Sequence, residues 1–185
     1  MANLDAPNGL KPVRHLTGGV IRTEEFKIAS GLSTAIFTGD CVKLLSTGYI
    51  DECDAGDRIL GVFAGCSYAN SSGEQVFSRQ WTASATTQGS VDVTAYIYSD
   101  PNIVYAVQSA GSADFADIGQ LADIVATAGD TNTGQSKHEI SGTTGTGTAG
   151  LRILRKYEEP NNAYGTNGVL EVQIYEHELT FATGV

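Results

Sequence analysis

Two short apolar runs on either side of a proline turn constrain the fold more than any other feature of the chain. Ala95–Ser99 and Ile103–Gln108 are rich in Val, Ile and Tyr, and Asp100-Pro101-Asn102 separates them. Proline presets φ near about −65°, and Asp and Asn side chains can hydrogen-bond their own turn backbone. The pattern predicts a β-hairpin. Farther on, Asp117–Val125 alternates polar and apolar residues around Gly119, as an extended segment bent at one permissive residue would.

The composition favours many short strands over long helices. The 185 residues include 22 glycines but only 4 prolines, and charged residues make up 17%. No long amphipathic helix is evident, and turn residues separate the apolar runs at short intervals. We therefore expect an all-β chain, a single β-barrel or β-sandwich domain with many short strands and long loops.

The expected strands combine branched or aromatic side chains with flanking Gly, Asn, Asp or Ser. Besides the two runs above, they are Val20–Ala29, Cys41–Ser46, Ile59–Ala64, Glu74–Trp81, Leu151–Arg155 and Val169–Leu179. In the last of these, Leu170, Val172 and Ile174 alternate with polar residues, which predicts a half-buried strand. Trp81, the sole tryptophan, is expected to anchor the core, with an interface role as the alternative.

Two regions differ from this pattern. Residues 1–19 contain two of the four prolines and end in Thr17-Gly18-Gly19, which indicates an extended N-terminal arm before a β-rich body at 20–185. Such an arm could lie along a neighbouring subunit or a partner surface, or it could be loose. Residues 127–150 almost lack large apolar side chains, so they are expected to form a long, flexible, exposed loop or a mobile hairpin.

Charge and hydropathy argue against two partner classes. The net charge is −10 and the pI about 4.6, so nucleic acid would be repelled by most of the surface. The sequence has no apolar run of the roughly 18 residues that span a bilayer, and its start does not resemble a signal peptide. We expect synthesis in the cytosol and no membrane partner.

The candidate metal ligands do not form a recognisable motif. Cys41, Cys53 and Cys66 are widely spaced and are expected to be buried free thiols. A zinc site would need a histidine to converge on them, and no local spacing supports this. The acidic run Asp51–Asp57 and the pair Asp114 and Asp117 are expected to be solvated turns, because neither has EF-hand spacing. We predict no metal and no cofactor.

Catalytic signals are equally weak. Gly145–Gly150 matches Gly-x-Gly-x-x-Gly, but a Thr/Gly loop before a strand is the wrong context for a nucleotide. His177 is expected to be a partly exposed cross-strand partner, His15 to belong to the arm and His138 to lie at a loop tip. Without a nucleophile elbow or an obvious base, the chain is not expected to be an enzyme.

Several segments taken together resemble short structural proteins of tailed bacteriophages, specifically capsid decoration or cement proteins. The segments occur in the same order over almost the whole chain. They are Asp5–Arg14, Asp100–Gln108, Asp117-Ile118-Gly119 with Ala122-Asp123, Thr133–Ser136 and Leu151–Arg155.

The resemblance implies a β-rich, non-enzymatic virion protein on the outer capsid surface, where it clamps subunits of the major capsid protein. It also implies self-association, with homotrimers common in such proteins. Within this hypothesis the contact residues are expected in the arm, and a deletion of Met1–Leu16 is expected to leave the core folded. The candidate contact residues are Asp5, Pro7, Leu10, Pro12, Val13 and Arg14.

Two other functions remain open at this point. A head-fibre or tail-associated adhesion module would bind a host surface, and exposed aromatics on loops would favour it; only Tyr164 qualifies. A small trimeric β-barrel enzyme with sites at subunit boundaries is the third alternative.

Overall fold

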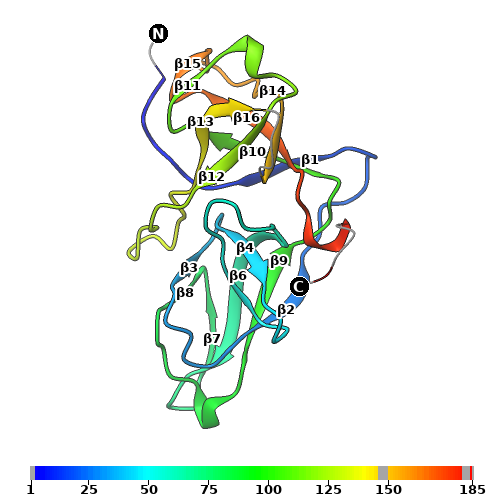
Figure 1. Cartoon of the computed structure of the whole chain (residues 1–185). Coiled ribbons are helices and arrows are strands. Elements are labelled where there is room, and N and C mark those ends of the chain that lie inside the picture. The colour runs from blue at the N-terminus through cyan, green and yellow to red at the C-terminus, as the bar shows by residue number, and fades with distance from the viewer. Residues whose placement is uncertain (1–2, 146–149, 181–183, 185) are drawn as a thin grey trace.

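The computed structural model describes residues 3–145, 150–180 and 184, and it confirms the all-β class. Two six-stranded sheets contain most of the strands. Figure 1 shows them stacked end to end, and we call them the upper and lower sheets. In the described ranges neither sheet closes into a barrel, so the architecture is sandwich-like.

The upper sheet is antiparallel throughout. In spatial order its strands are β1 (Lys11–His15), β10 (Ile103–Gln108), β16 (Val169–Ile174), β14 (Leu151–Lys156), β12 (Leu121–Val125) and β13 (Glu139–Gly145). β10 has a partner on each side and all its residues are buried, which explains its continuous apolar run. In β16 the predicted alternation is confirmed, because Leu170, Val172 and Ile174 all face the core.

The lower sheet is built around one long strand. In spatial order its strands are β2 (Glu24–Ile28), β9 (Val93–Tyr98), β6 (Gly61–Ala69), β4 (Cys41–Leu44) and β5 (Ile50–Glu52), with β7 (Gln75–Ser78) on the far part of β6. The small elements are the strand pairs β3 (Ile36–Phe37) with β8 (Gln80–Trp81) and β11 (Ser112–Ala113) with β15 (Gly165–Thr166), and the 3-10 turns η1 (Gln88–Ser90), η2 (Phe115–Asp117) and η3 (Glu178–Thr180).

Two apolar cores lie on opposite faces of the lower sheet. Because side chains alternate along a strand, Cys41 joins the core shared with the upper sheet while Val42 joins the other core. On β6, Val62 likewise joins the core shared with the upper sheet, and Phe63 joins the other core. The second core, which we call the lower core, surrounds Trp81, and this confirms its predicted anchoring role.

The predicted hairpin is wrong, although both of its strands and its turn exist. β9 pairs with β2 and β6 in the lower sheet, whereas β10 pairs with β1 and β16 in the upper sheet. The turn forms as expected, with the Ile103 amide donating to the Asp100 carbonyl at 3.1 Å. Both strands have partners on either side, so the turn connects two sheets instead of closing one ladder.

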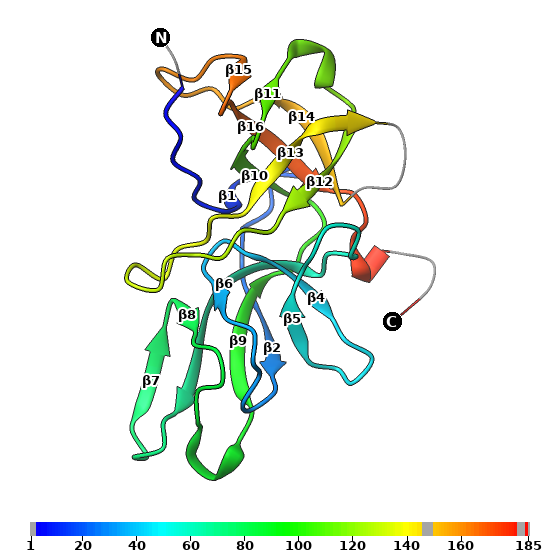
Figure 2. The same ribbon diagram turned by 60° about the vertical axis from the view of Figure 1, so that its left-hand side comes forward.

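The N-terminal segment packs against its own chain. Lys11–His15 forms β1, and Leu10 lies in the core. Asn3 holds the loop before β15, because its side-chain amide donates to the carbonyls of Ala163 at 2.9 Å and Thr166 at 2.8 Å. Figure 2 shows this segment running down beside the upper sheet to β1.

The predicted loop at 127–150 contains a strand. Glu139–Gly145 forms β13, an edge strand of the upper sheet that pairs antiparallel with β12, so of the two expectations the continuous loop is wrong there. Ile140 alone supplies a fully buried side chain in β13, which is why the sequence pattern was weak. Residues 146–149 of the expected glycine-rich fingerprint lie outside the described residues.

Candidate functional site: a polar seam between the two sheets

Buried polar groups concentrate where the two sheets meet. We call this boundary the seam. It has two patches, each with residues from both sheets: the first contains Gly9, Thr38–Asp40, Glu52 and Ser136–His138, and the second contains Ile59 and Glu176–Glu178.

A close approach of three small residues sets the geometry of the seam. Gly9 has φ of 65°, and a Cβ there would lie 2.5 Å from Ser136 Cβ and 2.6 Å from the Gly39 carbonyl oxygen. Only glycine fits both the backbone conformation and the space. The Leu10 amide donates to that carbonyl at 2.9 Å, and the Ser136 amide donates to the Thr38 carbonyl at 3.0 Å. These contacts bring the residues after Gly39 and Ser136 together.

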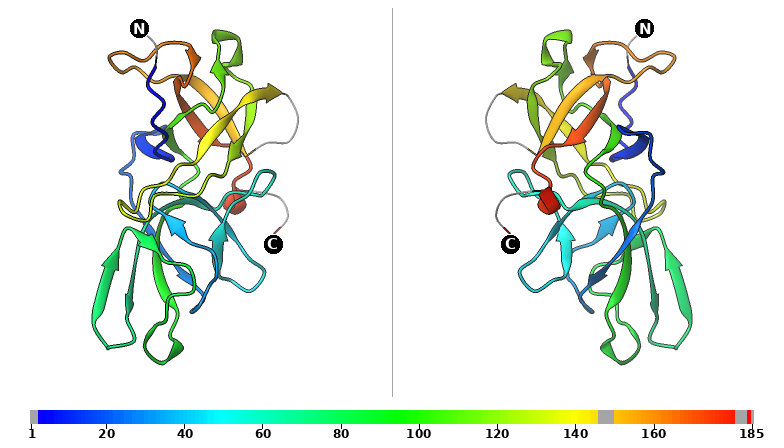
Figure 3. Two further views of the ribbon diagram at one scale, coloured as in Figure 1. Left: turned by 90° about the vertical axis from the view of Figure 1, so that its left-hand side faces the viewer. Right: turned by 90° about the vertical axis from the view of Figure 1, so that its right-hand side faces the viewer.

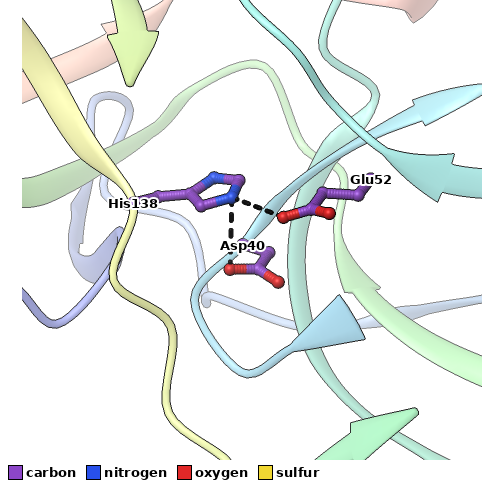
Figure 4. A group of neighbouring side chains, drawn as sticks. All are labelled: Asp40, Glu52 and His138. Atoms are coloured by element: carbon purple, nitrogen blue, oxygen red, sulfur yellow. Dashed lines mark hydrogen bonds and ion pairs between the residues drawn. The ribbon is translucent and has the colours of Figure 1, made fainter. Parts of the chain in front are cut away.

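Asp40, Glu52 and His138 meet at this place (Figure 4). Asp40 and Glu52 come from the lower sheet, at the start of β4 and the end of β5, while His138 precedes β13 of the upper sheet. His138 Nε2 lies 2.9 Å from Glu52 Oε1 and 3.4 Å from Asp40 Oδ1. The side chains of Asp40 and His138 are fully buried, and 21% of the Glu52 side chain is exposed.

Hydrogen bonds define the tautomer of the neutral His138 ring. The Cys41 amide donates to Nδ1 at 3.3 Å, so in the neutral ring the hydrogen sits on Nε2 and is donated to Glu52. Asp40 Oδ2 accepts from the Phe37 amide at 2.6 Å. Burial raises the pKa of Asp40 to about 6, against the opposing effects of His138, the Ser136 hydroxyl and the Phe37 amide.

The cluster can do one of two things chemically. Two carboxylates and an imidazole can hold a divalent cation, or they can share protons within a buried ion-pair network. Two surface hollows, of about 290 and 410 Å³, are lined by other residues. Because the side chains of Asp40 and His138 are fully buried, the arrangement is suited to joining the two sheets.

The sequence interpretation missed this cluster. His138 was expected at a loop tip and Glu52 in a solvated acidic turn, and both expectations are wrong because these side chains face each other across the seam. Asp54 and Asp57 do remain in a turn, where Lys43 pairs with Asp57 at 2.6 Å. The available signal was local: His138 and Ile140 alternate with Lys137 and Glu139, as inward positions of a strand would.

His177 provides the second connection across the seam. The Ile59 amide donates to the Glu176 carbonyl and the Glu178 amide donates to the Ile59 carbonyl, each at 3.0 Å. His177 was expected to be partly exposed within a strand, but it lies beyond the end of β16 and is buried. Burial lowers its pKa to about 4. Its Nδ1 accepts from the Leu179 amide at 3.2 Å, so Nε2 carries the hydrogen.

His15 makes an arrangement that superficially resembles a catalytic triad. Its Nε2 lies 3.0 Å from Asp100 Oδ2, and its Nδ1 lies 3.0 Å from the Thr17 hydroxyl. However, Nδ1 also accepts from the backbone amides of Thr17 and Gly19. An imidazole nitrogen already occupied by fixed amides is a poor general base, so these contacts stabilise the turn after β1.

The six predicted contact residues have different environments. Leu10 is 1% exposed in its own core, so it offers no surface to a partner. Arg14 pairs with the buried Glu171 at 2.9 Å, and Arg155 holds the other oxygen of that carboxylate at 2.8 Å. Asp5 is exposed and accepts from Gln108 at 3.3 Å. The others, Pro7, Pro12 and Val13, are half-buried. A contact role for these residues stays a prediction.

The remaining candidates from the sequence are structural. Cys41, Cys53 and Cys66 are free and buried, as predicted, and burial raises the pKa of each thiol. Asp114 and Asp117 cap η2, each side chain accepting from the backbone at the other end of the turn. Among the residues described, no helix is long and apolar enough to cross a membrane.

The fold and the seam together define a class: an all-β protein of two stacked antiparallel sheets joined by buried ionisable groups. Comparison takes the assignment no further, since no protein-family model matches the chain and neither the curated proteins nor the solved structures include a significant match.

Proposed function

We propose that the chain is a bacteriophage capsid decoration protein, which binds the outer surface of an icosahedral head and stabilises it by bridging subunits of the major capsid protein. The sequence resemblance supports this function, and one structural observation carries it. Exposed aromatic side chains occur at both ends of the elongated body, and a bridging protein needs two separated contact surfaces.

The first of these surfaces lies beside β11 and β15. Phe115 is 71% exposed and stacks edge to face on the partly exposed Tyr164, with ring centroids 6.0 Å apart. The second surface is on β7, where Phe77 is 76% exposed. Figures 1 and 3 place β7 at one end of the molecule and the β11–β15 pair at the other.

A bridging role would require no reaction at these surfaces, so we propose that the protein is not an enzyme. It would act on the outer capsid surface of the virion after synthesis in the host cytoplasm. Association with further copies of itself, as a homotrimer, would multiply weak contacts. The acidic surface would keep the free protein soluble before it meets a head.

The test is a binding stoichiometry on expanded heads that lack the protein. The heads are mixed with purified protein and sedimented, and the bound copies are counted per major capsid subunit. A saturating simple fraction together with greater heat resistance of the heads is expected. Phe77→Ser and Phe115→Ser should each reduce binding, whereas Val20→Ser, at an exposed apolar residue away from both ends, should not. Equal binding by all three variants would contradict the two-surface model.

The Phe115–Tyr164 pair also fits the second candidate, a head-fibre or tail-associated adhesion module, because it places two aromatic rings on surface loops. That function predicts only a few copies per particle and binding to host cells that depends on Phe115. Few or no bound copies in the sedimentation assay would favour this candidate and make host-surface binding the next measurement.

A further inference from the structure

We propose that Asp40, Glu52 and His138 form a binding site for one divalent transition-metal ion of the zinc class, which joins the upper and lower sheets. The site is separate from both aromatic surfaces, so this inference does not depend on capsid binding.

Two of the three distances between the donor atoms are close to those of a tetrahedral site. Metal bonds of about 2.0–2.1 Å place neighbouring ligands about 3.3 Å apart. In the structure Nε2 of His138 lies 2.9 Å from Glu52 Oε1 and 3.4 Å from Asp40 Oδ1, and all three atoms lie within 4.8 Å of one another. Small movements would therefore accommodate an ion.

An unpartnered buried oxygen is the second observation that indicates a cation. Asp40 Oδ1 makes no contact of hydrogen-bond geometry among the described residues and lies 3.4 Å from His138 Nε2, although the side chain is fully buried and points at that ring (Figure 4). Buried carboxylate oxygens are nearly always hydrogen-bonded or bound to a metal. Here the oxygen faces a ring nitrogen and a second carboxylate, and a cation would satisfy it.

The donor set selects the kind of ion. One imidazole nitrogen and two carboxylates suit zinc and its neighbours, whereas calcium and magnesium prefer oxygen ligands alone and more of them. The other Asp40 oxygen is fixed by the Phe37 amide, which orients the carboxylate toward the site. Glu52 is the most exposed of the three, so its side offers the path of entry and the position for a water ligand.

Metal binding at Nε2 of His138 would break the hydrogen bond that Nδ1, on the opposite side of the ring, accepts from the Cys41 amide. Nε2 must lose its hydrogen to become a ligand, and the ring must then carry hydrogen at Nδ1, where the Cys41 amide now points. The 3.3 Å separation is long for a hydrogen bond, so a small rotation of the ring breaks it. Metal binding at Nε2 therefore shifts the tautomer of His138, moving the hydrogen to Nδ1 with no net release of a proton from the neutral ring.

The test uses the full chain stripped of metal with a chelator and then titrated with Zn²⁺ by calorimetry. We expect one equivalent per chain and a melting temperature raised by about 5–10 °C at a hundredfold excess over Kd. With Co²⁺, visible absorption bands of tetrahedral geometry should appear with the same stoichiometry.

Matched variants distinguish Zn²⁺ binding at this site from nonspecific binding of cations to an acidic protein. Asp40→Asn and His138→Gln should each weaken Zn²⁺ binding by at least about tenfold. Asp54→Asn, an exposed carboxylate close to Glu52, and His177→Gln, the other buried seam histidine, should leave it unchanged. Absence of saturable binding to the wild-type chain would overturn the proposal, and so would equal affinity in Asp40→Asn. The latter variant preserves side-chain shape and so keeps the test valid if His138→Gln fails to fold.

Discussion

The lower core and the seam are stabilised in different ways. The lower core is apolar, with Trp81 stacked edge to face on Tyr68 at 5.5 Å, and its one thiol, Cys66, has a pKa raised by burial to about 12. The seam holds the buried ionisable side chains of Asp40, His138 and His177. Stability of the lower core should therefore be independent of pH, whereas the contact between the sheets should depend on protons and ions.

The difference shows where this fold can be adjusted. An apolar core gains stability from area and packing density, which solution conditions near neutral pH hardly alter. A seam of charged groups gains or loses stability with every change in protonation or metal occupancy. The predictions below separate the two kinds of stabilisation, beginning with a truncation that removes Gly9 from the seam and Leu10 from the shared core.

Deletion of Met1–Leu16 should give the largest effect, a loss of more than about 5 kcal/mol. Truncating a buried leucine alone costs about 2–5 kcal/mol, and this deletion also removes β1 and exposes the edge of β10. This predicted loss of stability replaces our expectation from the sequence that the core would remain folded after the deletion. Urea denaturation followed by tryptophan fluorescence and far-UV circular dichroism measures the loss. A shorter deletion, Met1–Ala2, which keeps the hydrogen bonds of Asn3, is the control. An unchanged denaturation midpoint for the Met1–Leu16 deletion would restore the idea of a detachable arm.

Trp81→Ala should cost about 3–5 kcal/mol, because it empties the centre of the lower core and removes a hydrogen bond to the Leu32 carbonyl at 3.2 Å. The loss should be the same at pH 5 and pH 8, since no group that titrates in this interval belongs to that core. Denaturant midpoints at the two pH values provide the measurement. A loss that changed by more than about 1 kcal/mol between them would show that the lower core is coupled to the seam.

Much of the strand pattern could be predicted from the sequence, and the pairing could not. Alternation in Val169–Ile174 and the apolar run Ile103–Gln108 locate β16 and β10, because burial of one or both faces leaves a direct mark on residue type. The proline turn is equally visible at Asp100–Asn102. Whether a turn closes a hairpin or connects two sheets depends on the partners of each strand, and these come from Lys11–His15 and Gly61–Ala69, distant in sequence.

The seam was hidden for a related reason. Asp40, Glu52 and His138 lie far apart in the chain and share no spacing motif, so only the fold brings them together. The close packing of Gly9 against Ser136 and Gly39 creates their meeting point. In sequence, those glycines are indistinguishable from the many that occupy turns. Polar residues in turn-rich segments are usually solvated, and that general rule gave the wrong environment for His138.

Asp40 and His177 should make opposite contributions to the pH dependence, each of about 3 kcal/mol. The pKa of Asp40 is raised from 3.8 to about 6, because the buried carboxylate destabilises the folded state when it is ionised. The free energy of unfolding is therefore reduced above pH 6, and it recovers as the pH falls toward 3.8. The pKa of His177 is lowered from 6.5 to about 4, so the stability present above pH 6.5 is lost as the pH falls toward 4. In the metal-free wild-type chain the two effects should largely cancel between pH 4 and 6.

The variants reveal each contribution. Asp40→Asn should be more stable than the wild type at pH 8 but not at pH 4, and it should lose stability steeply on acidification. His177→Gln should show the opposite slope, gaining relative to the wild type as the pH falls. Chemical denaturation at five or six pH values with a chelator present measures both. Parallel pH profiles for the two variants would contradict the assignment of opposing groups to the seam.

The smallest effect, about 1 kcal/mol for each single change, is expected for Arg14→Gln and Arg155→Gln on the outer face of the upper sheet. Glu171 is buried between these two arginines, which together hold its pKa below the ordinary value despite burial. Either arginine can still neutralise the carboxylate when the other is lost, and exposed arginines contribute little to stability on their own. The double variant leaves a buried charge without a partner and should therefore lose more than the sum of the single changes. A double-mutant cycle by urea denaturation measures this coupling, with Glu171→Gln as the background in which it should vanish. Additive losses would mean that Glu171 is solvated in solution, and Arg14 would then be available for the capsid contact that the sequence suggested.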